Sequence, residues 1–273
     1  MREVTFGQYF PSNSFVHKMN ASIKILIVIA YIVAVFSVKQ YHFLGFGICL
    51  AFVITVTAVA KVPFLKVLKS LKAIIFFIVF SAVLQLFFNK SGTPLWEGGF
   101  ITDEGLKSAI FVSVKVSLVV LGASILTLTT SPIELADGIE VLLYPLKIVR
   151  FPVHEFALIM SIALRFIPTL MEETDRIIKA QKARGADFDS GNLFKRAKAL
   201  IPVLIPLLVS SFRSADELAD AMDARCYAGS KNRTKFKKSV ITWRDLIGLI
   251  ITAGLVVAVV YCNGFYIFPA VFL

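Results

Sequence analysis

Hydrophobic residues occur in long runs along this chain, and polar residues gather between the runs. Five of these runs are too long for β-strands and have the length that an α-helix needs to cross a bilayer. They cover Ile23–Val38, Phe43–Ala60, Ala73–Phe88, Leu106–Thr130 and Leu246–Cys262. The pattern predicts an all-α, polytopic membrane protein with about five transmembrane helices.

A charged stretch, residues 131–242, separates the fourth run from the last. It opens with Ser131 and Pro132, which suit the N-cap and the first position of a helix. Two apolar pieces lie inside it, Phe156–Met171 and Ala199–Phe212. Both contain proline, and the first also contains an arginine, so we expect neither piece to span the membrane.

The chain is therefore expected to have three parts. Residues 1–130 form an N-terminal cytoplasmic segment and four transmembrane helices. Residues 131–242 form a cytoplasmic α-helical domain with two long helices, and residues 243–273 form the last transmembrane helix with a short external tail.

The lysines predict how the helices cross the membrane. The segment Lys61–Lys72 carries four lysines and no acidic residue, whereas the loop Asn89–Glu104 carries one lysine and three acidic residues. By the positive-inside rule the first segment faces the cytoplasm and the loop faces outward, which places the N-terminus and residues 131–242 inside. Because apolar residues alternate with the lysines of Lys61–Lys72, we expect this segment to lie at the membrane surface before the third helix.

Composition and missing motifs narrow the class of function. Hydrophobic residues make up 57% of the chain, and the net charge of +11 comes from basic residues beside apolar runs, so it does not indicate nucleic-acid binding. The sequence has no GxxxxGK[ST] phosphate loop, no HExxH motif and no zinc-type spacing of its three cysteines. It also has no acidic residue inside the five runs, where an ion-coupled carrier usually needs one. We therefore expect no catalytic, cofactor-binding or metal-binding residues, and neither an ATPase nor a transporter that works alone.

Lys115 lies inside the fourth run. It could mark a polar pathway or a contact with another membrane subunit. A helix that starts later, or a lysine that faces a crevice of the bundle, explains it equally well.

Two similar tripeptides, Ala183-Arg184-Gly185 and Ala224-Arg225-Cys226, each end a charged, helix-like segment. At helical spacing one face of the first segment carries Leu170, Thr174, Ile177, Gln181 and Arg184, and the second segment repeats this with Leu218, Met222 and Arg225. Neither arginine has an acidic residue three or four positions before it, so neither helix neutralises its own guanidinium. The alternative is a pair of solvated arginines that the helix dipole favours at a C-terminus.

Together with their placement, the paired tripeptides resemble the T-component (EcfT) family of energy-coupling-factor (ECF) transporters, which are ABC-type importers. The N-terminal segments Gly7–Pro11 and Ser14–Asn20, followed by Lys24, are similar to the opening of that family. The likeness covers nearly the whole chain. Two positions depart from the family pattern: Cys226 stands where a second glycine is common, and Asn20-Ala21 stand where Asp-Pro is expected.

The resemblance implies a non-catalytic coupling subunit in a prokaryotic cell membrane. It implies that residues 131–242 are a coupling domain, whose arginines Arg184 and Arg225 dock into two cytoplasmic ABC ATPase subunits. Ala183, Gly185, Ala224 and Cys226 are then the small neighbours of these arginines. A separate membrane protein, the S-component, binds the vitamin or metal ion and is held by the apolar helices. The alternative is a secondary transporter that acts without ATPases.

Overall fold

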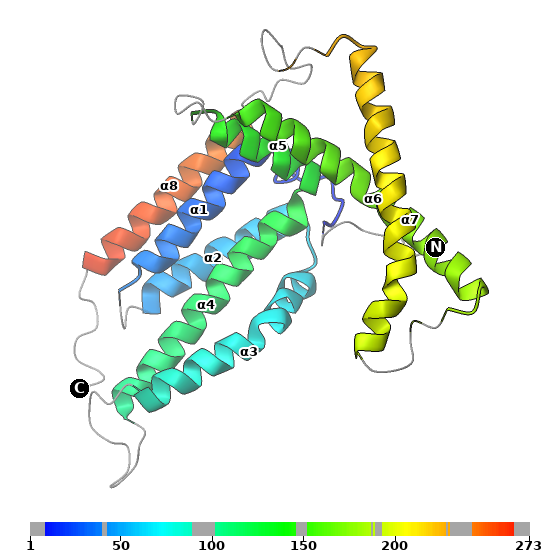
Figure 1. Cartoon of the computed structure of the whole chain (residues 1–273). Coiled ribbons are helices and arrows are strands. Elements are labelled where there is room, and N and C mark those ends of the chain that lie inside the picture. The colour runs from blue at the N-terminus through cyan, green and yellow to red at the C-terminus, as the bar shows by residue number, and fades with distance from the viewer. Residues whose placement is uncertain are drawn as a thin grey trace. The chain divides into compact units, whose positions relative to one another are not determined.

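The computed structural model of the chain contains eight α-helices and no β-strand among the residues that it describes (Figure 1). These residues are 9–39, 43–88, 102–145, 152–186, 188, 193–227, 229 and 242–264. The helices are α1 (Ala21–Ser37), α2 (Phe43–Ala60), α3 (Phe64–Phe88), α4 (Asp103–Thr129), α5 (Pro132–Leu143), α6 (Val153–Ala183), α7 (Leu193–Asp223) and α8 (Trp243–Gly264). The predicted all-α class is confirmed.

The chain divides into two compact units. The bundle unit comprises Thr5–Leu142 and Lys238–Leu273, and it contains α1 to α5 and α8. The long-helix unit comprises Met1–Val4 and Leu143–Lys237, and it contains α6 and α7. The domain predicted from the sequence begins at residue 131 and would include α5. In the structure α5 belongs to the bundle unit.

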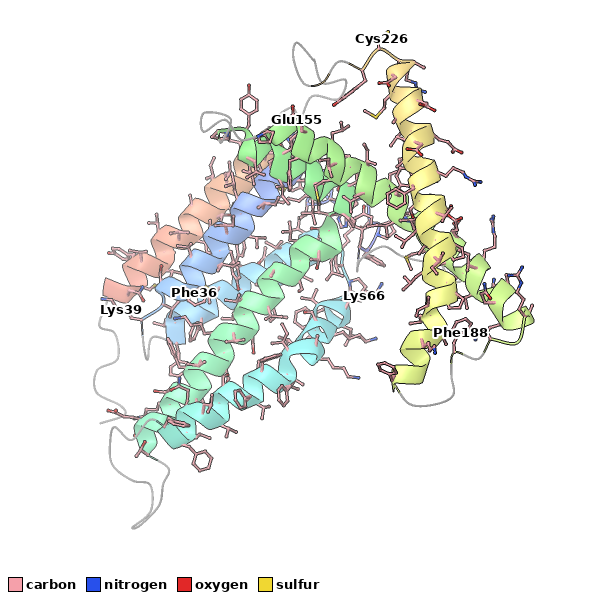
Figure 2. The ribbon with its side chains drawn as sticks, in the orientation of Figure 1. Phe36, Lys39, Lys66, Glu155, Phe188 and Cys226 are labelled. Atoms are coloured by element: carbon pink, nitrogen blue, oxygen red, sulfur yellow. The ribbon has the colours of Figure 1, made fainter. Side chains whose placement is uncertain are left out.

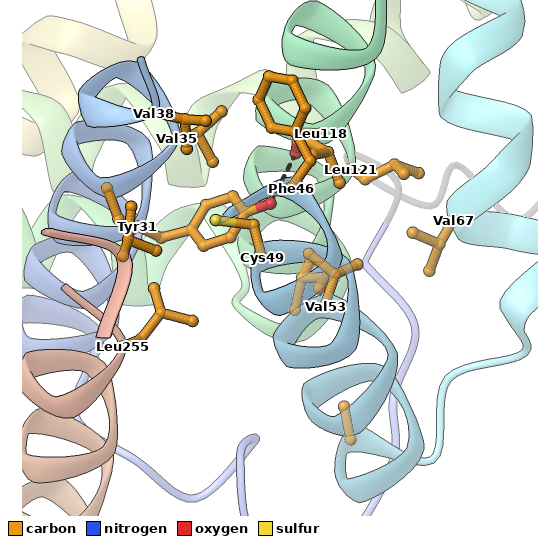
Figure 3. Packing of buried hydrophobic residues seen from close by; sticks show 14 of the residues in the cluster. Tyr31, Val35, Val38, Phe46, Cys49, Val53, Val67, Leu118, Leu121 and Leu255 are labelled. Carbon is orange, nitrogen blue, oxygen red and sulfur yellow. Dashed lines mark hydrogen bonds between the residues drawn. The ribbon is translucent and has the colours of Figure 1, made fainter. Parts of the chain in front are cut away.

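In the bundle unit, α1, α2, α4 and α8 pack around a common apolar core, and α3 packs along α4. Tyr31 lies at the centre of this core and donates a hydrogen bond from its hydroxyl to the carbonyl oxygen of Leu118, at 3.1 Å (Figure 3). Val35, Cys49 and Val53 are buried around it. A tyrosine hydroxyl is tolerated in this core because it finds an acceptor there.

Side-chain contacts fix the relative directions of three bundle helices. At one end of α1, Asn20 contacts Asp245 of α8, and at the other end Asn263 of α8 donates to the carbonyl of Ser37 at 2.7 Å. The helices α1 and α8 are therefore parallel and in step. Lys24 near the start of α1 contacts the carbonyl of Thr129 at the end of α4, so α1 and α4 are antiparallel. We name the two ends of the bundle the Asn20 end and the Asn263 end.

Lys115 lies beside the last turn of α1. Its ammonium donates to the carbonyl oxygen of Phe36 at 3.3 Å and lies 5.3 Å from the ring centre of Phe36 and 5.1 Å from that of Phe111. The last four carbonyls of a helix have no partner within it, and a cation there is stabilised by the dipole. The structure therefore favours the structural explanation of Lys115 as a lysine that caps a neighbouring helix.

Five stretches of described helix are long and apolar enough to cross a membrane: α2, α3, α4, α8 and residues Lys198–Asp223 of α7. Helix α1 is apolar but has 17 residues. The predicted span Ile23–Val38 therefore corresponds to a helix shorter than these five, and the α7 stretch overlaps Ala199–Phe212, which is not predicted to span. The prolines of the two long helices do not end them: α6 continues through Pro168, and α7 through Pro202 and Pro206.

The third predicted span differs at its start. Helix α3 begins at Phe64, so most of the lysine-bearing segment forms its first turns and is not a separate surface segment. Val67 is fully buried, while Lys66 places its ammonium 4.0 Å from the ring centre of Phe10. The lysines therefore extend an apolar helix at the end where it leaves the membrane core.

Candidate docking site at two helix ends

The two helices of the long-helix unit contact each other and run in opposite directions at the contact. The Ser210 hydroxyl of α7 donates to the carboxylate of Glu173 of α6 at 2.6 Å, and the Gln181 side chain donates to the carbonyl of Pro202 at 3.4 Å. The Pro202 carbonyl is an acceptor because a proline follows it closely in the helix: the carbonyl four residues before Pro206 has no N–H partner within α7. The prolines of α7 therefore help to fix where α6 crosses it.

One face of α6 is less exposed than the others, and it is the face predicted from helical spacing: Leu170, Thr174, Ile177 and Gln181 are all half-buried. Among the acidic residues beside this face, Glu172 and Asp175 are exposed, whereas Glu173 is half-buried and accepts the hydrogen bond from Ser210. Glu173 joins the two helices because the Ser210 hydroxyl of α7 lies within hydrogen-bonding distance of its carboxylate.

Helix α6 ends in a Schellman motif. The amide of Ala186 donates to the carbonyl of Gln181 at 3.0 Å, and the amide of Gly185 donates to the carbonyl of Lys182 at 3.0 Å. Gly185 has a φ of 87°, a left-handed conformation that costs glycine little. Arg184 is the residue between the last helical residue and this turn.

Helix α7 ends in the same way. The amide of Tyr227 donates to the carbonyl of Met222 at 3.0 Å, and the amide of Cys226 donates to the carbonyl of Asp223 at 2.9 Å. Cys226, labelled at this helix end in Figure 2, takes the place of Gly185 with a φ of 55°. Arg225 therefore has the same backbone position as Arg184.

The repeated tripeptide is thus a helix-ending motif as well as a charge motif. Its small third residue occupies the left-handed position, which explains why glycine suits it, and Cys226 adopts that conformation at a cost of roughly 1 kcal/mol. From the sequence the small residues are only the neighbours of the docking arginines, and the turn is not predicted. A signal was present, since glycine one residue beyond a helix is the usual sign of this cap.

Both arginines are accessible. Arg184 and Arg225 are exposed, as are the small neighbours Ala183 and Ala224. Neither guanidinium forms an ion pair or a hydrogen bond with any side chain in the described part of the chain. Each helix end therefore presents a planar cation whose donors are available to a partner.

The two arginines lie far apart. Gln181 contacts Pro202, and Arg184 follows Gln181 within one helical turn. From Pro202 to the end of α7 at Asp223 the helix extends for about 30 Å at 1.5 Å per residue. The site is therefore two separate points, each with the same backbone geometry, and not one cluster of charge.

No group of three or more His, Cys, Asp or Glu side chains is arranged to hold a metal ion among the residues that the structure describes. Cys49, Cys226 and Cys262 are free thiols, of which Cys226 is the exposed one.

The fold defines a polytopic α-helical membrane protein with an additional unit of two long helices. Residues 12–236 match the CbiQ family, described as cobalt transport protein. The ECF transporter transmembrane protein EcfT of Ruminiclostridium cellulolyticum is 48% identical over 249 residues, covering 90% of this chain and 92% of the relative. EcfT of Clostridium kluyveri is 47% identical (94% and 95% covered), and that of Bacillus subtilis 44% (93% and 97%). The chain belongs to this family of ECF transporter transmembrane proteins, the T-components.

Proposed function

We propose that the chain is the coupling subunit of an ECF importer. It joins two cytoplasmic ABC ATPase subunits to a membrane S-component that binds the vitamin or metal ion. ATP is hydrolysed by the ATPases, and this chain itself has no catalytic role. The family membership and the two matching helix ends support this function.

The observation that carries the proposal is the pair of equivalent arginines about 30 Å apart. One partner groove cannot hold both, but two ATPase subunits can each hold one. An arginine suits such a groove because its planar fork serves several acceptors and is weakly hydrated. The exposed Ala183 and Ala224 let a partner surface approach the backbone beside each arginine.

The S-component has a suitable surface on α7. Seven apolar side chains on one broad face of this helix are exposed: Leu200, Ile201, Leu204, Ile205, Leu208, Val209 and Phe212. An exposed apolar patch of this kind marks a protein or membrane contact. We propose that this face holds the S-component, with lipid covering the part that the S-component leaves free.

A secondary transporter is the alternative function. It needs a membrane-buried acid that can change its protonation or ion contacts. Asp245 at the start of α8 is the described acid with no exposure, and it accepts three hydrogen bonds from groups of this chain. This arrangement favours a structural role for Asp245 and therefore the coupling function.

The test is a pull-down of the ATPase subunits combined with an uptake assay. Arg184→Ala and Arg225→Ala should each weaken assembly, because losing one member of a buried charge pair costs roughly 2–5 kcal/mol. One intact site still holds the complex together, since the second docking event is intramolecular. The double variant should lose both ATPases and uptake, and lysine at both positions should give an intermediate result. Normal binding and uptake by the double variant would contradict the proposal.

The orientation of the chain forms part of the proposal: the N-terminus and the long-helix unit face the cytoplasm. In a background without cysteines, a single cysteine at Lys90 should react with an impermeant reagent from outside, and one at Asp187 only from inside. Both positions lie outside the described residues. External labelling at Asp187 would rule out docking of Arg184 to a cytoplasmic ATPase.

A further inference from the structure

A lysine is buried at the Asn20 end of the bundle. The side chain of Lys24 is 4% exposed, and its ammonium donates to three oxygens: the carbonyls of His17 and Thr129, each at 3.1 Å, and the hydroxyl of Thr130 at 3.3 Å. An ammonium has three N–H donors, so all of them are used. Lys24 therefore joins the N-terminal segment to the last residues of α4.

A buried carboxylate lies at the same end. Asp245 has no exposure and accepts from the amide of Asn20 at 2.9 Å, from the side-chain amide of Asn20 at 3.0 Å and from the amide of Thr242 at 2.8 Å. It joins the residue before α1 to the first turn of α8. Asn20 and Lys24 are one helical turn apart, so a single short segment holds both α4 and α8. We call Asn20, Lys24, Thr129, Thr130 and Asp245 the clamp.

The place of the clamp along the chain gives it a significance beyond stability. Thr129 and Thr130 directly precede α5, after which the chain enters the long-helix unit at Leu143. The chain returns to the bundle unit at Lys238, shortly before Asp245. The connections from α5 to α6 and from α7 to α8 thus both start or end beside the clamp, which holds them to one segment of the bundle.

Helix α5 is also held closely at this end. A Cβ atom on Gly138 would lie 2.9 Å from the amide nitrogen of Ser22 and 3.0 Å from the carbonyl carbon of Ala21. Only glycine permits this approach of α5 to the first turn of α1, since the opposing atoms are backbone. The start of α5 is fixed as well, because Ser131 and Glu134 bond to each other's amides at 3.3 Å.

We propose that Lys24 and Asp245 are positioning residues for energy coupling: the clamp makes α5 and the start of α8 move as one body with the bundle, so that movement of the long-helix unit reaches the membrane helices. The proposal rests on the coupling function proposed above. Such a connection transmits movement only if it is stiff. Buried charges whose hydrogen bonds are all made in a low-dielectric site provide that stiffness, because each alternative arrangement leaves a charge without a partner.

The main test uses the complete complex, reconstituted in liposomes with both ATPases and a riboflavin-binding S-component. ATP hydrolysis and uptake of radiolabelled riboflavin are measured per assembled complex. Lys24→Met should leave assembly and hydrolysis in place and lower the riboflavin taken up per ATP by roughly 5- to 100-fold. Lys18→Met, which removes an exposed lysine of the same segment, should stay within about twofold of the wild type. Lys24→Arg, which retains the charge and the donors, should restore part of the lost uptake.

A second measurement reports the stiffness directly. Spin labels are placed at Asp137 on α5 and at Lys39 beyond the far end of α1, both of which are exposed. Pulsed electron resonance should give a narrow distance distribution for the wild type and for Lys18→Met, and a broad one for Lys24→Met. An unchanged distribution with normal uptake per ATP in Lys24→Met would overturn the proposal.

Milder variants keep the test decisive if Lys24→Met does not fold. Asn20→Ala removes the side-chain bond to Asp245 and keeps the backbone one, and Thr130→Val removes the hydroxyl acceptor of Lys24. Both should lower uptake per ATP more than they lower hydrolysis. If uptake and hydrolysis fall in equal proportion, the clamp is merely structural and the proposal is wrong. If instead the wild-type chain does not bind ATPases, the coupling function fails, while the spin-label distances still report on the clamp.

Discussion

The two units of the molecule use charged residues in opposite ways. In the bundle unit, Lys24 and Asp245 are buried, and each makes three hydrogen bonds within the chain. In the long-helix unit, Arg184 and Arg225 are exposed at helix ends and make none with the described side chains. Burial with full satisfaction is typical of a group that holds a fold together, whereas an exposed and repeated cation is available to a partner. The comparison separates charged residues that stabilise the fold of this chain from charged residues that are available to contact other subunits.

The largest effect on stability is expected for the buried charges. Asp245→Ala leaves two backbone amides and the side-chain amide of Asn20 without this acceptor, and of the two negative charges near Lys24 it leaves only that of Glu134. It should therefore lower the free energy of unfolding by roughly 3–5 kcal/mol. Asp220→Ala, which removes an exposed acid of α7, should change it by less than about 0.5 kcal/mol. Thermal unfolding in detergent measures both. Equal stability of the two variants would show that the buried charge of the bundle unit contributes no more to folding than an exposed charge of the long-helix unit.

A carboxylate placed on the inner face of α6 should have the next largest effect. Ile177→Asp puts a charge among half-buried groups near the contact with α7 and should destabilise the long-helix unit by roughly 1–3 kcal/mol. Ala180→Asp adds the same charge to an exposed position of the same helix and serves as the control. Protease resistance of α6 and α7 reports the difference, and a fully active, resistant Ile177→Asp variant would show that the inner face is wrongly assigned.

Substitution of the third residue of each tripeptide, Gly185 or Cys226, should change the stability of the two helix ends in opposite directions. Cys226→Gly relieves the left-handed strain and should stabilise the last turn of α7 by roughly 1 kcal/mol, whereas Gly185→Ala should destabilise that of α6 by a similar amount. Amide exchange of the capping residues Ala186 and Tyr227 measures the two changes. The same sign of change at both ends would contradict the shared geometry.

The smallest effect concerns His17 in the N-terminal segment. Its Nε2 donates to the carbonyl of Phe10 at 3.0 Å, and its Nδ1 lies 2.7 Å from the Ser14 hydroxyl. Burial lowers the pKa of His17 below its ordinary value of 6.5, only partly opposed by the bond to Phe10. The folded state then binds fewer protons than the unfolded state, so stability should decline as the pH falls below about 6.5. His17→Gln should flatten this part of the profile of unfolding temperature against pH.

The sequence predicted most of the membrane helices because each is a long apolar run with its own turn residues. The runs beginning at Phe43, Leu106 and Leu246 correspond to α2, α4 and α8. The sequence did not show how α7 accommodates its prolines. The carbonyl of Pro202, which Pro206 leaves without a partner within α7, accepts a hydrogen bond from Gln181 of α6.

The candidate site was predicted as residues but not as geometry. The repetition of Ala-Arg-small identified Arg184 and Arg225, and their backbone position became visible only with the two Schellman turns. The clamp could not be predicted at all. Lys24 lies at the start of the first apolar run, and Asp245 lies more than two hundred positions away from Asn20 along the chain, so no local pattern connects them.

The measurement that tests the central claim most directly is the affinity of the purified subunit for the ATPase pair. Two double variants are compared, each of which removes two exposed arginines, one from α6 or its end and one from α7 or its end. Arg184→Ala with Arg225→Ala should raise the Kd by roughly a thousandfold or more, because both buried charge pairs are lost. Arg176→Ala with Arg213→Ala should stay within about threefold, as expected for solvated charges. Equal affinities of the two variants would show that the arginines of the helix ends are ordinary surface residues and would contradict the proposed docking.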